Sequence, residues 1–555
     1  MCIKKYITFM ALSSLLVSNA QNNTPKTFVA PFDFPLTLSA NFGELRSNHF
    51  HGGIDFKTMG EVGKPIHCIA DGYVSRILIM PGGYGQAIFI VHPNGYTSVY
   101  GHVKSFVPSI EKIVEDYQLK HETFSADLKF EPDIIKFKSG DIIAFSGNEG
   151  YSFGPHLHME IRKSDTDEFI DPLQFYKDKV KDTRAPQATA VVVYPQKGKG
   201  IINGSSNKKT IPVASLNQGA TVWGEIGFGI KAFDYMDGTY NHYGVYKVSL
   251  FVDNERVFTS IMNGILPDEN RMINAYIDYE EFKKRNSWIM RSYSLPGNTL
   301  RNIETSNNRG IININQERDY NIRYELEDLY GNKKDYSFKL TGKPSNIEPY
   351  IVDERNVLRW NKSNVVQEPG LELIIPKGML YDDVEMNLEI KSDSTYIANV
   401  YKLHDIPVPL HSYCSLMIGL RKMPVKDSTK YYIASVIGNN KNYIGGTYMK
   451  GWMKTDIREL GTYTVAIDTV APKIIPLYKN QWRNGNIQFR VSDSETGIKN
   501  HKVYIDGKFY IFKYDLKNSK IIMKYPQRLP KGMAHKMDVI IEDRCGNIKR
   551  ENYLF

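Results

Sequence analysis

The residues best suited to chemistry lie in one short segment, residues 154–161, which reads Gly-Pro-His-Leu-His-Met-Glu-Ile. In an extended strand, successive side chains point to opposite faces. His156, His158 and Glu160 therefore share one face, and the apolar residues that alternate with them share the other. The apolar face indicates a core. The polar face sets two imidazoles side by side at a surface, which suits a metal ion if further ligands exist elsewhere.

Further ligands lie upstream, in the sequence His51-Gly52-Gly53-Ile54-Asp55. A zinc ion that catalyses hydrolysis needs three protein ligands and an open position for water. His51, Asp55 and His158 would supply two imidazoles and one carboxylate, and the two glycines would allow a sharp turn between the first two. We therefore predict one zinc ion on these three side chains. His49 is a neighbouring alternative ligand, but the spacing favours His51.

Hydrolysis of an amide needs more than a metal. Zinc polarises the scissile carbonyl and lowers the pKa of its bound water to about 7. A base must then take a proton from the water, and other groups must stabilise the oxyanion and protonate the leaving amine. His156 is placed for this work, because it lies two residues from a predicted ligand on the same strand face. His102, at the end of a predicted strand, is the other candidate.

Short strands must position these residues. The runs 73–80, 86–92 and 97–103 are rich in β-branched and aromatic residues and predict strands. Asn94-Gly95 lies between the last two runs, and because this pair tolerates positive φ it predicts a hairpin turn. The hairpin would deliver His102 to one end of the sheet.

The region as a whole resembles peptidase family M23, the zinc metallopeptidases that include lysostaphin and the LytM-like peptidoglycan endopeptidases. The resemblance covers roughly residues 30 to 180 and rests on several short motifs: Asn41-Phe42-Gly43, His51-x-x-x-Asp55, Gly83-Tyr84-Gly85, Tyr100-Gly101-His102, Ser139-Gly140-Asp141 and Gly154-Pro155-His156-Leu157-His158. It implies an antiparallel-sheet catalytic domain with zinc on His51, Asp55 and His158. It also implies that His102 and His156 are the catalytic pair and that the substrate is peptidoglycan.

The sequence departs from the family pattern at two places. Where the family usually has a short link after His102, this chain has an insertion at about residues 105–137. Apolar residues recur there at helical spacing, with Ser109 as the expected N-cap. We expect the insertion to wall the substrate groove. Asn148-Glu149 is the second departure: Glu149 either recruits an amine of the substrate or is a solvated loop carboxylate, and the latter is favoured.

The rest of the chain predicts a series of β domains. The sequence Asp182-Thr183-Arg184-Ala185-Pro186 has a near copy at residues 468–472, and a Glu-Asp-x-x-Gly-Asn turn occurs at residues 327–332 and 542–547. Such spacing of strands and turns favours antiparallel sandwiches. We predict a mainly β fold, in which the M23-like domain is followed by Ig-like β-sandwich domains. The expected boundaries are 1–20 for a signal peptide, 24–182 for the peptidase domain, 183–345 for an Ig-like domain, 346–467 for a β-rich domain of undecided class and 468–555 for an Ig-like domain.

Two Asp-rich turns, Asp234 to Asp237 and Asp493 to Glu495, could bind calcium through their carboxylates. They lack an ordered run of oxygen ligands. Ordinary turn chemistry, in which Asp side chains bond to nearby backbone groups, is therefore the favoured interpretation.

The N-terminus predicts export. Lys4 and Lys5 precede an apolar run, residues 6–17, and Ser18-Asn19-Ala20 offers small residues for cleavage. That run is too short to span a bilayer, and no later segment is long and apolar enough to do so. We therefore expect the mature chain in the periplasm, at the cell surface or in the medium.

Composition sets further limits. The formal net charge of +9 over 555 residues is modest and comes without the dense basic stripe that nucleic acid binding requires. It fits weak attraction to an anionic surface such as a cell wall, and it fits equally a solvated surface that simply has more Lys than Glu. Cys68, Cys414 and Cys545 are too sparse for a disulfide framework, so we expect mostly buried free thiols.

These observations together predict an exported zinc metalloendopeptidase that hydrolyses the peptide cross-links of peptidoglycan. The later β domains would position it on the wall or on a protein partner. The alternative is a non-catalytic peptidoglycan-binding or regulatory protein of the same fold, but all five site positions are filled, which argues against loss of activity. An adhesin-like stalk would leave those five polar residues unexplained.

Overall fold

The computed structural model describes residues 28–392, 397–527 and 529–555, and most of its sheets are antiparallel. The prediction of a mainly β fold is confirmed. The predicted signal peptide, residues 1–20, lies outside the described residues. No helix in the described part of the chain is long and apolar enough to cross a membrane. We call residues 28–182, 183–345, 346–467 and 468–555 the first, second, third and fourth regions.

The first region is built on a sheet whose main path runs β1-β4-β13-β8-β7-β6-β10. The strands are β1 (Leu38–Ala40), β4 (Ile54–Lys57), β13 (His156–Lys163), β8 (Tyr96–Gly101), β7 (Gln86–Val91), β6 (Gly72–Ile79) and β10 (Ala126–Lys129). β13 lies between β4 and β8, well inside the sheet. Its apolar face is fully buried, as predicted. The opposite face is not at the surface as expected, because His158 and Glu160 are also buried.

The predicted hairpin is confirmed. β7 and β8 pair antiparallel with Val91 opposite Thr97, and Gly95 in the turn has φ +85°, a value that favours glycine. The predicted helix is also present as α1 (Pro108–His121). Its N-cap is Val107 rather than Ser109, because Pro108 takes the first helical position, where its missing N–H is tolerated.

The second region forms a large sheet of its own and contributes one short strand to the sheet of the first. The main path of the large sheet is β16-β15-β17-β25-β24-β18-β19-β22. These strands are β16 (Lys209–Pro212), β15 (Gln187–Ile202), β17 (Thr221–Phe233), β25 (Lys333–Gly342), β24 (Asp319–Glu327), β18 (Lys247–Val252), β19 (Glu255–Ile261) and β22 (Ile303–Thr305). β14 (Phe169–Ile170) of the first region pairs with β20 (Gly264–Ile265) of the second, and one continuous cluster of buried apolar residues spans both. The two regions therefore share a core.

The third and fourth regions each consist of two principal sheets over a core of their own. In the third region one sheet consists of β27 (Asn364–Glu368), β28 (Leu371–Ile375), β32 (Val408–Gly419), β36 (Trp452–Leu460) and β35 (Thr447–Met449). The other consists of β30 (Glu389–Lys391), β31 (Val400–Lys402), β37 (Thr462–Ile467), β33 (Tyr431–Ile437) and β34 (Asn440–Gly445). In the fourth region the sheets are β38 (Lys473–Leu477), β39 (Asn486–Ser492), β43 (Lys520–Lys524) and β42 (Lys513–Asp515), and β41 (Lys508–Tyr510), β40 (Ile498–Ile505), β44 (Lys536–Asp543) and β45 (Ile548–Leu554). Within the described residues, the three cysteines are free and buried, as predicted.

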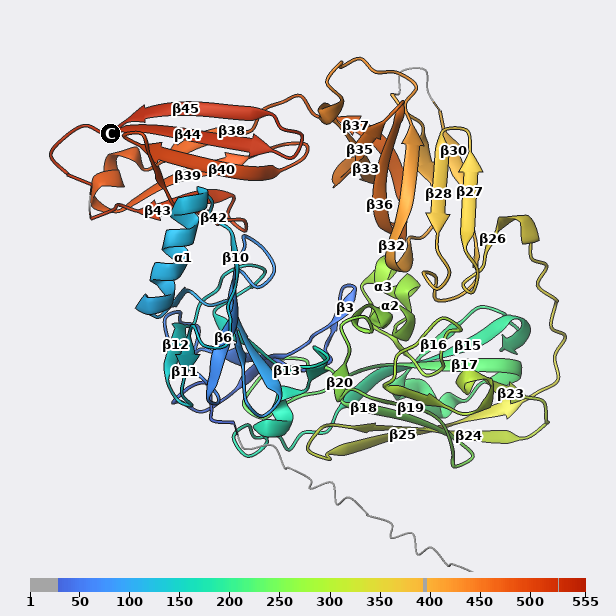
Figure 1. Cartoon of the computed structure of the whole chain (residues 1–555). Helices are drawn as coiled ribbons and strands as arrows, with labels where there is room; N and C mark the ends of the chain where they lie inside the picture. The colour runs from blue at the N-terminus through green and yellow to red at the C-terminus, as the bar shows by residue number, and fades with distance from the viewer. Residues whose placement is uncertain (1–27, 393–396, 528) are drawn as a thin grey trace, which may run out of the picture.

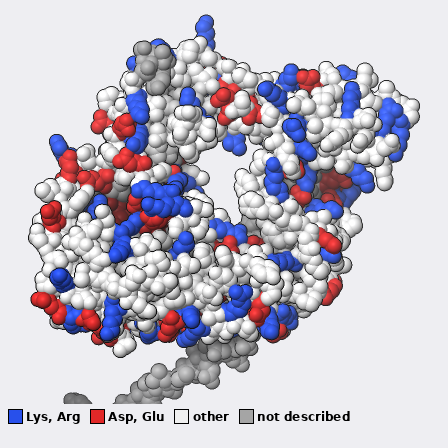
Figure 2. Space-filling model, turned by 180° about the vertical axis from the view of Figure 1, so that it is seen from behind, with Lys and Arg blue, Asp and Glu red and all other residues white. Residues whose placement is uncertain are grey.

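The chain closes on itself. Figure 1 shows the regions arranged in a ring, with the fourth region (red) lying beside α1 and β10 of the first. Figure 2 shows the opening of this ring from the opposite side, with Lys and Arg side chains interspersed among Asp and Glu. Lys502 and Tyr504 of β40 hydrogen-bond to Glu122 at the end of α1, at 2.8 and 2.7 Å. The fourth region therefore contacts the first region, although the two lie far apart in the sequence.

Candidate active site

Strand register brings the predicted metal ligands together. Asp55 of β4 lies directly opposite His158 of β13. His158 Nδ1 is 2.8 Å from Asp55 Oδ1 and 3.0 Å from His51 Nε2. His51 Nε2 is 3.1 Å from Asp55 Oδ1, so the three donor atoms form a small triangle. His49, the alternative ligand, is exposed, and its Nδ1 bonds to the carbonyl oxygen of Ser47 instead.

The triangle fits a zinc ion. Ligand atoms arranged tetrahedrally about 2.0–2.1 Å from zinc lie roughly 3.3 Å from one another. The observed separations of 2.8–3.1 Å approach this value, so small shifts of the side chains would admit the ion. Two imidazole nitrogens and one carboxylate oxygen are also donors that zinc prefers. All three side chains are buried, which limits the number of competing water ligands.

The two glycines between His51 and Asp55 were expected to allow a sharp turn, but the structure requires them for another reason. Neither has positive φ, so no left-handed turn requires them. A Cβ on Gly53 would lie 2.3 Å from the carbonyl oxygen of Met159, and one on Gly52 would lie 2.6 Å from the ring of Phe169. Glycine is needed there because the backbone of the ligand loop passes close to its neighbours.

A second layer of hydrogen bonds orients the two histidine ligands. His51 Nδ1 donates to the carbonyl oxygen of Asn41 at 2.7 Å, which leaves Nε2 to bind the metal. His158 Nε2 donates to Glu160 Oε1 at 2.8 Å, which leaves Nδ1. Such bonds fix the tautomer and orientation of a ligand ring and raise its basicity.

Glu160 is itself held by two further side chains. Arg162 bonds to its Oε2 from Nη2 at 2.6 Å and from Nε at 2.8 Å, and the Tyr84 hydroxyl donates to its Oε1 at 2.7 Å. We did not predict these roles from the sequence. The signal was present, because His158, Glu160 and Arg162 alternate along one face of β13. No comparable pattern in the sequence indicated Arg46, which donates from Nη2 to Asp55 Oδ2 at 2.9 Å.

Burial and the neighbouring side chains together set the pKa values of the site. Burial lowers the pKa of His51 to about 4 and that of His102 to about 3, and it also lowers the pKa of His156. These three rings are therefore neutral at pH 7, the state needed for binding a metal or accepting a proton. Burial acts in the same direction on His158, but Asp55 and Glu160 outweigh it and raise the pKa of His158 to about 9. Burial raises the pKa of Asp55, but the His51 and His158 rings outweigh it and hold that pKa well below its usual value.

His102 and His156 stand side by side next to the triangle, with ring centroids 4.8 Å apart. His102 Nδ1 donates to the carbonyl oxygen of Glu149 at 2.7 Å, and His156 Nδ1 donates to that of Gly154 at 2.8 Å. Nε2 is thus the nitrogen of each ring that is left for proton transfer. His156 Nε2 lies 3.7 Å from Asp55 Oδ1, beside the metal ligands. His102 has φ +59°, a conformation that is uncommon outside glycine and is often held at functional sites.

The fourth region contacts the loop that holds this histidine pair. Lys513 of β42 forms an ion pair with Glu149, whose side chain is only 17 % exposed. The expectation of a solvated Glu149 is therefore wrong, because a domain distant in sequence covers it. Lys517 Nζ donates to the carbonyl oxygens of Asn148 and Ser152 at 2.5 and 3.0 Å. The loop that orients His102 is thus anchored from outside the first region.

The insertion at 105–137 also faces the fourth region. Phe124 lies 6.3 Å from His501 between ring centroids, and it lines a cavity of about 240 Å³ together with Glu149 and Lys513. The insertion thus helps to form the surface on which the fourth region docks. Its expected role as a wall of the substrate groove stays a prediction.

Replacing Lys517 by alanine should lower kcat several-fold and leave the zinc content unchanged. The change removes three hydrogen bonds to the loop between Asn148 and Ser152, and an exposed charged contact of this kind is worth about 1 kcal/mol or less. The measurement is turnover on soluble cross-linked muropeptides, the class of substrate that the resemblance of the sequence implies, with Lys524→Ala on neighbouring β43 as the matched control. Equal turnover in the two variants would mean that the docking contact does not influence the histidine pair.

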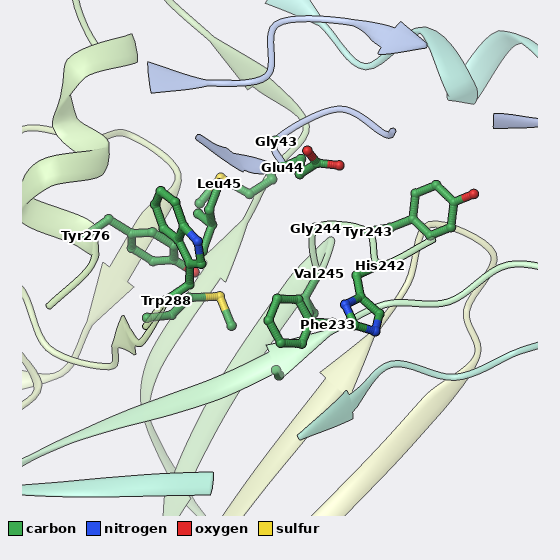
Figure 3. A pocket seen from close by; sticks show the side chains of 13 residues that line it. Gly43, Glu44, Leu45, Phe233, His242, Tyr243, Gly244, Val245, Tyr276 and Trp288 are labelled. Carbon is green, nitrogen blue, oxygen red and sulfur yellow. The ribbon is translucent and has the colours of Figure 1, made fainter. Parts of the chain in front are cut away.

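The cavity shown in Figure 3 lies away from the candidate metal ligands. It measures about 160 Å³ and is lined by residues of the first and second regions, including Glu44, Trp288 and His242. The His242 ring stacks on Phe233 with centroids 4.9 Å apart. None of the three candidate metal ligands lines this cavity, so it is not the place of the reaction.

Comparison with known proteins identifies two segments. Residues 49–119 match the model of peptidase family M23, and residues 355–468 match the model of a Zu5-like domain, which gives a class to most of the third region. The DD-carboxypeptidase/endopeptidase Mpg of Neisseria meningitidis is 30% identical over 118 residues, 21% of each chain. An uncharacterized metalloprotease of Haemophilus influenzae is 32% identical over 111 residues, 20% of this chain and 18% of that protein. The chain thus spans about a fifth of the length of these curated relatives.

Solved structures resemble the same part of the chain. The catalytic domain of lysostaphin from Staphylococcus simulans is 21% identical and covers 26% of this chain and 92% of its own, with a TM-score of 0.20. The catalytic domain of EnpA from Enterococcus faecalis, an M23 protein, is 25% identical and covers 25% of this chain and 88% of its own, with a TM-score of 0.19.

Proposed function

We propose that the protein is an exported zinc metalloendopeptidase that hydrolyses the peptide cross-links of bacterial peptidoglycan, since residues 49–119 of its first region match the model of peptidase family M23. One observation carries the proposal. The donor atoms of His51, Asp55 and His158 converge within 3.1 Å, and the paired rings of His102 and His156 lie beside them. A relative named as a DD-carboxypeptidase/endopeptidase supports the class of substrate.

The chemistry follows from the states of the side chains. A zinc ion held by His51, Asp55 and His158 would polarise the scissile carbonyl and lower the pKa of a water molecule to about 7. Because burial keeps His102 and His156 neutral, Nε2 of either ring can accept a proton from the attacking water. Burial also destabilises the imidazolium that results, which favours return of the proton to the leaving amine. The Glu149 and Gly154 carbonyls hold the two rings in the required tautomer.

A non-catalytic wall-binding protein of the same fold is the competing function. Such a protein would have no need for five buried or half-buried polar side chains arranged in one cluster, nor for the Glu160–Arg162 pair behind His158. Retention of the complete set supports the enzyme. The substrate places it outside the cytoplasm, and the third and fourth regions would provide contacts to the wall or to a protein partner.

Digestion of isolated sacculi tests the proposal directly. The mature protein should convert cross-linked muropeptides into uncross-linked ones, and mass spectrometry of the fragments would identify the bond that is cut. Addition of a zinc chelator should stop the reaction, and readdition of zinc should restore it. Sacculi whose fragments are unchanged by zinc-loaded protein would contradict the proposed function.

A further inference from the structure

Three buried aspartates gather away from the zinc centre. Carboxylate oxygens of Asp182, Asp234 and Asp328 all lie within 4.8 Å of one another, and the three residues are 7%, 2% and 2% exposed. Asp182 lies at the entry to the second region, Asp234 directly follows β17, and Asp328 directly follows β24. The ends of two strands and the connection from the first region therefore bring three negative charges to one point.

The protein compensates for only part of this charge. The Arg184 backbone N–H donates to Asp182 Oδ1 at 3.0 Å, and the Asn332 side chain donates to Asp328 Oδ2 at 2.7 Å. Asp182 Oδ2 and Asp234 Oδ1 are buried and have no hydrogen-bond partner. A buried carboxylate oxygen without a partner is costly, because it has lost its water and gained nothing in exchange. Burial, with the neighbouring aspartates, raises the pKa of Asp182 to about 7 and that of Asp234 to about 8.

The three carboxylates line a small cavity at the junction of the first two regions. Its volume is about 10 Å³, which is room for one water-sized particle. Asp171 and Phe42 of the first region also line it, together with Tyr246 and Tyr330 of the second. A cation in this cavity would face the two unpartnered oxygens and would hold the first two regions together.

A second cluster of three aspartates occurs among the described residues and can be compared with the first. Asp468, Asp493 and Asp543 also approach within 4.8 Å. There the Thr496 hydroxyl donates to Asp468 Oδ2 at 2.7 Å and so supplies the partner that Asp182 Oδ2 lacks. The second cluster thus has one unpartnered buried oxygen, Asp493 Oδ2, where the first has two.

We propose that Asp182, Asp234 and Asp328 bind one Ca²⁺ ion. Donors that are all anionic oxygens suit a hard cation, whereas zinc prefers nitrogen and sulfur. Mg²⁺ usually keeps several of its water molecules, and a cavity of about 10 Å³ has no room for them. Ca²⁺ accepts flexible geometry and oxygens at 2.3–2.6 Å. The Asp-rich turn at 234–237 thus contributes to a metal site, and ordinary turn chemistry is not its only role.

Calcium binding to the full zinc-loaded chain tests this site. Equilibrium dialysis with elemental analysis should find Ca²⁺ bound, and the thermal midpoint of the first two regions should rise by about 4 °C at about 100 times Kd. Asp234→Asn should lose one bound Ca²⁺ per chain and the associated shift. Asp335→Asn, at an exposed position of β25 in the same region, is the matched control and should behave as the wild type.

The calcium-free state gives a second measurement. There, Asp234→Asn should melt at or above the wild-type temperature, because it removes repulsion between carboxylates, and Asp182→Asn provides the same test at another ligand. A wild type that takes up no Ca²⁺ would overturn the proposal and indicate a shared proton in the cluster. Unchanged Ca²⁺ stoichiometry in both variants would also overturn it, as would an equal thermal shift with MgCl₂ alone.

Discussion

Replacing His158 with alanine should remove zinc from the protein and reduce peptidoglycan hydrolysis to the background rate. His158 Nδ1 is one of three candidate donor atoms, 2.8 Å from that of Asp55 and 3.0 Å from that of His51. Loss of a hydrogen-bond partner behind a ligand already lowers metal affinity about 10- to 100-fold, so loss of the ligand itself should exceed this. Zinc per chain, measured by elemental analysis, should fall from about one to near zero.

His49→Ala is the matched control. His49 lies two residues from His51 but is exposed, and its ring bonds to the Ser47 carbonyl. This variant should keep its zinc and its activity. Circular dichroism would verify that both variants fold, because removal of His158 leaves the Asp55 and Glu160 carboxylates buried without their common partner. A His158→Ala protein that retains stoichiometric zinc would show that the metal is held elsewhere.

Local patterns in the sequence were enough to predict the residues that meet at the candidate metal site. Alternation along β13 places His156 and His158 on one face, and Asn94-Gly95 fixes the hairpin that ends near His102. These signals work because strand geometry and turn chemistry are decided within a few residues. The prediction of Ser109 as the N-cap of α1 also rested on local residues, and it was wrong. Pro108 begins the helix one residue before Ser109.

Contacts between distant segments could not be predicted in this way. Lys513 and Glu149 are 364 positions apart, and nothing near either residue indicates that they meet. The aspartates were visible as repeated turns, but only the fold shows that Asp182, Asp234 and Asp328 share one buried point. Burial itself was also missed: the face of β13 that carries His158 and Glu160 was expected at a surface, yet neighbouring strands and loops cover it.

Burial keeps the rings of His102 and His156, the proposed catalytic pair, neutral at pH 7. His102→Ala and His156→Ala should each keep about one zinc per chain, because neither ring supplies a donor to the triangle. Each should lower kcat about 10²- to 10⁴-fold, the usual effect of removing a general acid or base. Turnover of soluble cross-linked muropeptides and zinc content, measured on the same preparations, separate these variants from His158→Ala.

The control must be a histidine of the same region that lies outside the site. His121, at the end of α1, meets this need, since its ring lies against that of Tyr117 with centroids 4.3 Å apart. His121→Ala should retain the wild-type rate. If His102→Ala keeps both its zinc and its rate, proton transfer rests on His156 alone, because the two rings are adjacent and share the same neutral state. If both variants keep the wild-type rate, the adjacent rings serve the structure of the site and the base lies elsewhere.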